Sequence, residues 1–435
     1  MMSDEIVAAI DVGTTKVCTI VGRRFGKHGI QVLGYSTVKS TGLRKGNVSD
    51  AAATERAVRA SIKAIQEKTG YQVDSAFVGI TGAHVQFSNR HEKLRIKNDR
   101  GVVTSEDIKR APRKLSESID APGRTVIHAN TISYTLDGEA GIRNPLGMHS
   151  TEMDVETHFV TGSDKFIDRL VGSVEAAGVK VKSLVLEPLA SGLAVLTPEE
   201  RENGAIIVDI GGGTTDIVGF KGSRVYYTGV IPVGGYQFTN DIALSFNSPY
   251  EAAEAVKVKY ASAEFQAVSV DEQIGIPVIG RDKELRVNRL EICQLARERA
   301  LELARMIKVK LDAEREEGME DTMLVLTGGA SNLPGLADLV KKCVGINVRQ
   351  GVPDVHGTVP AELKDPTYAT GVGILLWGLT EYVTEDTEQK SKQKAVVISG
   401  VTPATVVSNG FFGGLKRRIG ALVPALFFAP KKGRV

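Results

Sequence analysis

The chain of 435 residues is long enough for several subdomains, and its 42% hydrophobic and 24% charged residues are typical of an ordinary globular protein. Its three cysteines show no CxxC spacing, which indicates reduced thiols and a cytosolic compartment. Acidic residues interrupt the N-terminal stretch and no apolar run reaches about 18 residues, so we expect neither a signal peptide nor a membrane-spanning helix.

The net charge of +2 conceals an asymmetry along the chain. No acidic residue follows Glu388, whereas nine Lys and Arg residues do, so subtraction leaves the first 388 residues at −7. An acidic body with a basic tail argues against nucleic acid as the main partner. It indicates instead a tail that meets an anionic surface.

Residues 6–22 contain two apolar runs around a glycine-threonine turn, which predicts two buried strands joined by a tight hairpin. Glycine lets backbone N–H groups approach phosphate oxygens, and threonine adds hydroxyl donors. Asp11 is placed to hold a hydrated Mg²⁺, although an aspartate that caps a strand turn would look the same. Lys16 would touch the β- or γ-phosphate, unless it is merely an exposed turn lysine. The predicted cradle consists of Gly13, Thr14, Thr15 and Lys16.

The elements that follow this first hairpin are expected to complete most of one half of the protein. We expect a strand at 30–36, a helix at 49–68 capped by Ser49 or Asp50, and a strand at 74–82.

Residues 84–161 indicate a small α+β insertion. Its helix is expected at 105–118, and Pro112 should kink or shorten it. Its strands are expected near 85–87, 94–96, 125–134 and 152–160. A helix at 165–177 and a strand at 181–186 then return to the first half.

The stretch 205–218 repeats the first hairpin, with Asp209 in the place of Asp11. Its predicted cradle consists of Gly211, Gly212, Gly213, Thr214 and Thr215. Two such copies in one chain suggest a duplicated domain whose hairpins face each other across a cleft, with a nucleotide between them. The alternative is a glycine-rich hairpin without a ligand.

Downstream, a strand at 226–233 precedes helices expected at 234–243, 249–260 and 287–312. Residues 384–409 lack helical periodicity and indicate a flexible linker.

The terminal stretch 411–428 places apolar residues on one side at helical spacing, with basic residues at the flank. This pattern is typical of an amphipathic helix that lies on an anionic membrane, although the helix could instead pack on the protein's own body. The predicted membrane residues are Phe411, Phe412, Leu415, Lys416, Arg417, Arg418, Ile419 and Leu422.

Five motifs together resemble the actin, Hsp70 and sugar-kinase superfamily: the two hairpins, the connecting segments 186–195 and 369–378, and the adenosine loop 325–335. The resemblance implies an α/β, actin-like ATPase fold with two ribonuclease-H-like halves around a nucleotide cleft. It further implies contacts to the base and ribose from Gly235, Glu254, Lys257, Gly328, Gly329 and Ala330. Glu254 and Lys257 lie three residues apart, so an ion pair on a helix surface explains them almost as well.

Glu187 opens the first connecting segment, and by the same resemblance it would orient the water that attacks the γ-phosphate. It could instead cap the helix that follows Pro188. The residues leave open whether ATP is turned over rapidly or serves as a slowly hydrolysed structural ligand.

The insertion resembles subdomain 1C of the FtsA family of bacterial cell-division proteins, most clearly at 141–147. The amphipathic terminus favours this family over a PilM-like pilus scaffold, and the absence of a long substrate-binding half disfavours a metabolite kinase. The implied subdomains are 1A (1–83, 162–192 and 355–383), 1C (84–161), 2A (193–228 and 300–354), 2B (229–299), the linker (384–409) and the membrane-targeting segment (410–435).

The FtsA resemblance implies an ATP-binding protein that forms actin-like protofilaments and tethers FtsZ polymers to the cytoplasmic face of the inner membrane. Its partners would be FtsZ, further copies of itself, anionic lipid, and other division proteins that meet subdomain 1C. We expect the acidic tail of FtsZ on the helix that carries Arg297 and Arg299, unless the neighbouring glutamates simply pair with those arginines.

Overall fold

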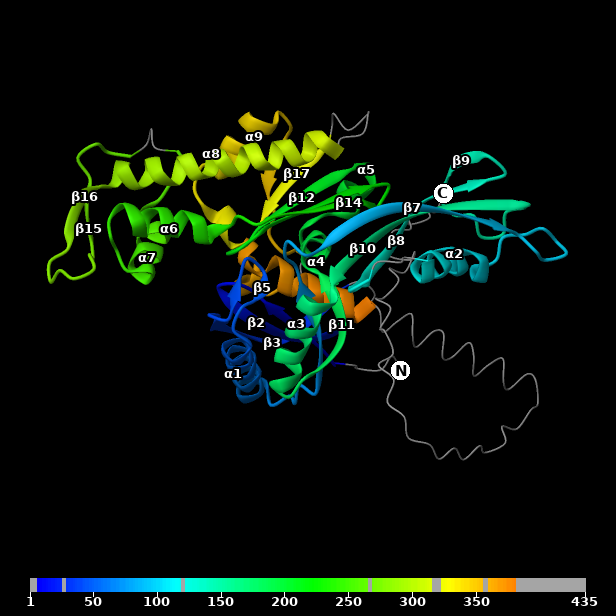
Figure 1. Cartoon of the computed structure of the whole chain (residues 1–435), viewed down its shortest axis with the longest axis horizontal. Helices are drawn as coiled ribbons and strands as arrows, with labels where there is room; N and C mark the ends of the chain where they lie inside the picture. The colour runs from blue at the N-terminus through cyan, green and yellow to red at the C-terminus, as the bar shows by residue number, and fades with distance from the viewer. Residues whose placement is uncertain are drawn as a thin grey trace.

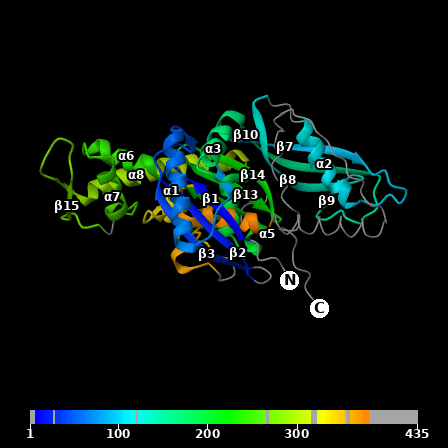
Figure 2. The same ribbon diagram turned by 90° about the horizontal axis from the view of Figure 1, so that it is seen from below.

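The computed structural model describes residues 6–25, 29–118, 122–264, 268–314, 322–354 and 359–380. Two α/β halves form the centre of the molecule, and a smaller subdomain lies at each end (Figures 1 and 2). The predicted linker at 384–409 and the amphipathic segment at 410–435, with every predicted membrane residue from Phe411 to Leu422, lie outside the described residues. Within the described part, no helix combines the length and the apolar character needed to cross a bilayer.

The first half is built on a five-stranded sheet with the order β11-β6-β1-β2-β3. Its strands are β1 (Ile6–Val12), β2 (Lys16–Phe25), β3 (Gly29–Lys39), β6 (Ser75–Ile80) and β11 (Lys180–Leu186). β1 and β2 form the predicted antiparallel hairpin, and β1 runs parallel to β6. The hairpin turn therefore projects from the edge of the sheet at which β6 also ends.

Helices α1 (Ala51–Thr69) and α3 (Asp164–Ala176) pack together on one face of this sheet. The side chain of Asp50, rather than that of Ser49, caps α1 by accepting a hydrogen bond from the backbone N–H of Ala53. A short hairpin of β4 (Leu43–Arg44) and β5 (Asn47–Val48) precedes α1.

The second half repeats this plan with the strand order β14-β13-β12-β17-β18. Its strands are β12 (Ala205–Ile210), β13 (Thr215–Lys221), β14 (Arg224–Ile231), β17 (Met323–Thr327) and β18 (Val348–Gln350). β12 and β13 are an antiparallel hairpin, and β12 runs parallel to β17 as β1 does to β6. The predicted duplication is confirmed. Helices α5 (Pro198–Asn203) and α9 (Leu336–Val344) also belong to this half.

Helix α4 (Glu187–Val195) and the helical residues 369–380 lie between the two sheets. Leu189 and Val372 share one buried core with Ile20 of the first sheet and Ile207 of the second. The two helices approach so closely that a β-carbon on Gly373 would lie 1.8 Å from the carbonyl oxygen of Ala190. This crossing holds the two halves together at the floor of the space between their hairpins.

The inserted subdomain is a four-stranded sheet with the order β7-β10-β8-β9. It comprises β7 (Gln86–Arg95), β8 (Arg124–Leu136), β9 (Glu139–Ile142), β10 (Glu152–Ser163) and helix α2 (Ser105–Ser118), which packs on the sheet. The two short strands expected near 85–87 and 94–96 are one continuous strand, β7. Pro112 lies inside α2 without shortening it, because Ala111 and Leu115 on either side are buried against the sheet.

The subdomain at the opposite end contains α6 (Gly235–Ser245), α7 (Tyr250–Tyr260), β15 (Gln273–Ile276), β16 (Leu285–Asn288) and the first part of α8 (Arg289–Glu314), which runs on over the second half and packs against α9. The helix expected from residue 287 begins two residues later, because Val287 and Asn288 pair with β15. Periodicity alone does not reveal that pairing.

Candidate functional site

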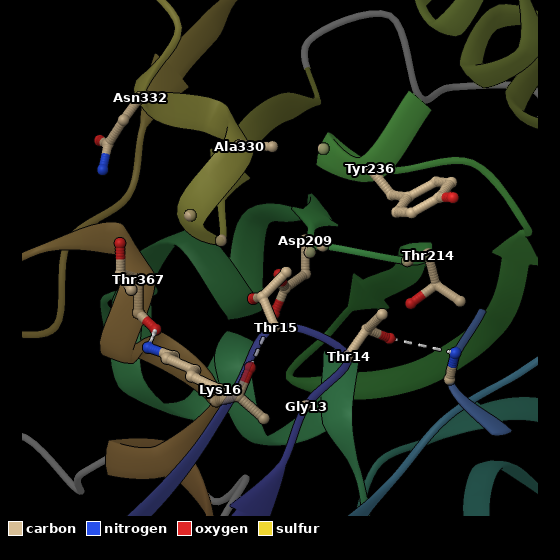
Figure 3. Close-up of a pocket in the computed structure, with 18 of the residues that line it drawn as sticks. Gly13, Thr14, Thr15, Lys16, Asp209, Thr214, Tyr236, Ala330, Asn332 and Thr367 are labelled. Carbon is tan, nitrogen blue, oxygen red and sulfur yellow. Dashed lines mark hydrogen bonds between the residues drawn. The ribbon is translucent and has the colours of Figure 1, made fainter. Parts of the chain in front are cut away.

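The two glycine-threonine hairpins face each other across a cavity of about 360 Å³ between the halves (Figure 3). Both turns have the same closure: Gly13 N–H donates to the carbonyl of Lys16, and Gly211 N–H donates to that of Thr214, each at 2.9 Å. All predicted cradle residues except Thr215 line the cavity. Thr215 is fully buried, and its hydroxyl donates to the carbonyl of Val233 at 2.9 Å.

The tips of the hairpins approach each other closely enough to require glycine. A β-carbon on Gly212 would lie 2.5 Å from Cγ2 of Thr15, and one on Gly213 would lie 2.5 Å from Oγ1 of Thr14. Backbone N–H groups and threonine hydroxyls from both halves therefore border one small space, which suits a chain of phosphates.

Four carboxylates gather in the cavity: Asp11, Asp209 and Asp216 are buried, and Glu187 is half-buried. Burial raises the pKa of Asp11 to about 6, although Lys16 opposes the shift. Burial also raises the pKa of Asp209, and it raises that of Asp216 to about 7. The pKa of Glu187 is raised well above its usual value by burial and then by the three aspartates.

These carboxylates fit the magnesium ion that the sequence implies. The described residues contain no group of three or more metal-ligating side chains placed to hold an ion. A hydrated Mg²⁺ needs only one or two carboxylates, and a cation would offset the repulsion among the four acids.

Glu187 is the first residue of α4, where the preceding Leu186 occupies the N-cap position without a side-chain hydrogen bond. Glu187 is therefore not the N-cap residue of this helix, as the alternative interpretation required. Its side chain lines the cavity instead.

Lys16 is turned toward the segment that follows the second half. Its Nζ donates to the carbonyl of Thr367, and it lies 4.3 Å from the ring centroid of Tyr368. Both residues belong to the short helix η3 (Pro366–Tyr368), which leads into residues 369–380. Lys16 lines the cavity from this position (Figure 3).

The residues expected to contact the base and ribose also line the cavity. Glu254 and Lys257 do form an ion pair, at 2.8 Å, but the Lys257 side chain is only 15% exposed. Lys257 also donates to the carbonyl of Gly235 at 3.3 Å. Gly328 has φ of +82°, and Ala330 follows in the turn η1 (Gly329–Asn332). The ion pair is thus part of the cavity wall.

Several residues of the site were not predicted. Asp216 accepts hydrogen bonds from Thr81 and Thr214. In the second copy of the hairpin it occupies the position of Lys16, and this equivalence is the sequence feature that could have identified it. Tyr236 follows the Gly234-Gly235 pair and stacks on Tyr250, with ring centroids 5.2 Å apart. Thr81, Tyr250 and Thr370 reach the site through the tertiary fold, and no local pattern marks them.

The predicted partner-binding arginines lie on α8, outside the cavity lining. Arg299 is held by Asp241 through hydrogen bonds of 2.7 and 2.9 Å and also contacts Glu302. Arg297 donates to the carbonyl of Ala263 at 2.8 Å. The alternative that acidic side chains pair with these arginines is therefore observed at Arg299, which contacts Asp241 and Glu302.

The duplicated halves and paired hairpins define an actin-like ATPase fold. Among solved structures, the chain resembles the PilM-PilN type IV pilus biogenesis complex, with a TM-score of 0.61 and 19% identity over 86% of this chain and 98% of that one. It also resembles MreB5 of Spiroplasma citri bound to AMPPNP, with a TM-score of 0.53 and 14% identity over 89% and 99% of the two chains.

Residues 206–373 match the family of the cell division protein FtsA, and residues 82–161 match the SHS2 domain inserted in FtsA. The FtsA of Pseudomonas aeruginosa is 33% identical over 389 residues, which cover 87% of this chain and 90% of the relative. The chain belongs to the FtsA family of cell division proteins, as its motifs and insertion predicted.

Proposed function

We propose that this chain binds ATP with Mg²⁺, polymerises as an actin-like protein, and attaches FtsZ filaments to the cytoplasmic face of the inner membrane. The observation that carries the proposal is the pair of hairpins that face each other across one cavity, in a chain of the FtsA family. The MreB5 structure of similar fold was solved with bound AMPPNP, which supports nucleotide binding by this chain as well.

In this proposal Thr14 and Thr15 donate hydroxyl hydrogen bonds to the phosphates, together with the backbone N–H groups of the glycine turns. Thr214 joins them by exchanging its hydrogen bond to Asp216 for one to a phosphate oxygen. Asp11 and Asp209 hold the metal through its water shell, and Mg²⁺ supplies positive charge at the phosphates. Lys16 exchanges the carbonyl of Thr367 for a phosphate oxygen, a change of partner that needs only rotation of its flexible side chain.

Glu187 is the residue we assign to orient the attacking water, because it lines the cavity beside the aspartates. Its raised pKa favours the protonated form, which cannot accept a proton from water, whereas a cation bound nearby would favour the carboxylate. We expect at most slow hydrolysis, with ATP acting mainly as a ligand that stabilises the assembling form.

The alternative functions are a PilM-like scaffold of a membrane assembly and, less favoured, a metabolite kinase. The likeness to PilM concerns the fold, whereas the family match and the relative at 33% identity favour an FtsA function. A phosphate-transfer assay separates the kinase, because a kinase requires an acceptor and a tether does not.

A vesicle assay tests the tether directly. Labelled FtsZ is sedimented with anionic liposomes in the presence of Mg²⁺-ATP, with this chain, without it, or with a version that ends at Asn409. We expect FtsZ in the pellet only with the complete chain. FtsZ that stays in the supernatant in all three samples would contradict the proposed function.

A further inference from the structure

Asp209, at the end of β12, is the point at which four separate segments of the chain meet. Ser191 of α4 donates a hydrogen bond to Oδ2 of Asp209, and Thr370 of the helical residues 369–380 donates one to the same oxygen at 3.0 Å. The two hydroxyl oxygens lie 3.1 Å from each other. On the other side of the carboxylate, a β-carbon on Gly328 would lie 2.2 Å from Oδ1.

This arrangement fixes the orientation of the carboxylate. The χ2 torsion of an aspartate is broad and roughly two-fold when nothing restrains it. Two donors on one oxygen, and backbone against the other, remove that freedom. Ser191 is fully buried, and Asp209 and Thr370 are 5% and 8% exposed, so water does not readily replace either donor.

We propose that Ser191 and Thr370 are positioning residues that aim the Asp209 carboxylate at the Mg²⁺ of the bound nucleotide. The inference rests on the proposed function, since it concerns the metal of that same site. Groups that hydrogen-bond a metal-binding side chain orient it, and their loss commonly weakens metal affinity by about 10- to 100-fold. Ser191 and Thr370 belong to the two helices that join the halves, so the metal site is tied to both connections.

A purely structural role is the competing explanation. In that case the hydroxyls would only satisfy a buried carboxylate and link two packed helices. Their loss would lower stability but leave the Mg²⁺ requirement of nucleotide binding unchanged. The two explanations therefore differ in a measurable quantity other than ATPase activity.

The experiment measures binding of a fluorescent ATP analogue to the complete chain, first in EDTA and then across a Mg²⁺ titration. In Thr370→Val, which keeps the side-chain shape and removes the donor, we expect the Mg²⁺ concentration for half-maximal enhancement to rise about tenfold. Affinity in EDTA should stay within about twofold of the wild type. Ser191→Ala should behave in the same way.

Two controls sharpen the test. Thr370→Ser retains the hydroxyl and should keep the wild-type Mg²⁺ requirement. Thr380→Val changes a threonine of the same helix whose hydroxyl donates to the carbonyl of Leu376, and it should have no effect. If Thr370→Val fails to fold, Ser191→Ala carries the test alone.

The outcomes separate this inference from the proposed function. Wild-type protein that binds no nucleotide at any Mg²⁺ concentration would overturn the proposed function itself. Wild-type protein with Mg²⁺-dependent binding, and variants with an unchanged Mg²⁺ requirement, would overturn only the positioning role of Ser191 and Thr370.

Discussion

The imidazole of His158 lies with Nε2 3.2 Å from the hydroxyl oxygen of Thr228, and this pair joins the inserted sheet to β14 of the second half. The other ring nitrogen, Nδ1, lies 2.6 Å from Oδ1 of Asn89. Burial, with a smaller effect of His128, lowers the pKa of His158 to about 3. The ring is therefore neutral near pH 7, and both of its nitrogens have partners inside the protein.

This buried histidine makes a contribution to the free energy of unfolding that is lost in mild acid. In the unfolded chain His158 takes up a proton as the pH falls through about 6.5, whereas in the folded chain it resists protonation down to about pH 3. At this residue the unfolded state thus binds more protons in that range, so the contribution of His158 to the free energy of unfolding falls by up to about 1.4 kcal/mol per pH unit below 6.5. The raised pKa values of Asp11 and Asp216 act in the opposite direction, so the effect of His158 is measured against a variant.

Denaturant unfolding of wild type and His158→Gln at pH 7 and pH 5 measures this effect. Glutamine can donate and accept without titrating, so the variant should lose about 2 kcal/mol less than the wild type over this interval. Equal losses in both proteins would show that His158 does not control the acid response.

Local chemistry explains how much of the site was predictable. The sequence predicts the hairpins because the pattern of an apolar run, an aspartate, and then glycine and threonine is specific for a phosphate-binding turn. Asp216 and Thr81 meet across 135 residues of sequence, and Ser191 and Thr370 across 179, so only the tertiary fold brings them together. The start of α8 was misplaced for the same reason, because a strand pairing overrides helical periodicity at Val287.

A second prediction concerns the nucleotide. ATP with Mg²⁺ should raise the melting temperature by mass action, equivalent to about 2.7 kcal/mol at a ligand concentration one hundred times Kd. Lys16→Ala removes a phosphate contact and Asp209→Ala removes a metal-binding carboxylate, so each should lose most of that shift. Lys63→Ala, an exposed lysine on α1, is the matched control and should shift like the wild type. ATP binding at the wild-type level in both cavity variants would refute the site.

The inserted subdomain should serve assembly rather than nucleotide binding. None of the residues that line the described cavity falls within 84–161, and Thr81, which precedes the insertion, is the lining residue nearest to it in sequence. Replacing 84–161 with a short linker should leave ATP affinity within a few-fold while polymer formation, followed by light scattering, declines. The deletion also removes the contacts of His158 with Thr228 and of Ile132 with Arg224, so the protein should melt at a lower temperature. A soluble, folded deletion that no longer binds ATP would contradict this division of roles.

The proposed FtsZ contact can be tested at Arg297. Arg299 forms an ion pair with Asp241, so reversing its charge would place two like charges together, whereas Arg297 donates a hydrogen bond to the carbonyl of Ala263. Arg297→Glu should weaken binding of a labelled acidic FtsZ tail peptide at least about tenfold, or 1.4 kcal/mol, through charge repulsion. Lys341→Glu makes the same charge change on α9 and should leave the affinity unaltered. Unchanged affinity in Arg297→Glu would move the contact elsewhere.

The proposed membrane segment is residues 411–428, which lie outside the described part of the chain. Eighteen residues from Phe411 to Phe428 could just span a hydrocarbon core of about 30 Å, but Lys416, Arg417 and Arg418 lie within it, where burial costs several kcal/mol. We therefore expect the segment to lie flat in the interface, a pose that would avoid this cost by placing the apolar residues in the acyl boundary and the basic ones at the headgroups. Pro424 should end the regular helix near Val423.

Sedimentation with anionic liposomes tests this anchor. With Lys431, Lys432 and Arg434, the segment carries six basic residues, each contributing about 1 kcal/mol of attraction to anionic lipid, and this attraction should fade as salt is raised. The complete chain should therefore pellet with vesicles at physiological salt. A chain that ends at Asn409 should stay in the supernatant, and so should the double variant Leu415→Asp with Ile419→Asp, because charged groups on the apolar side oppose burial. If the truncated chain still pellets, another surface of the protein holds the membrane.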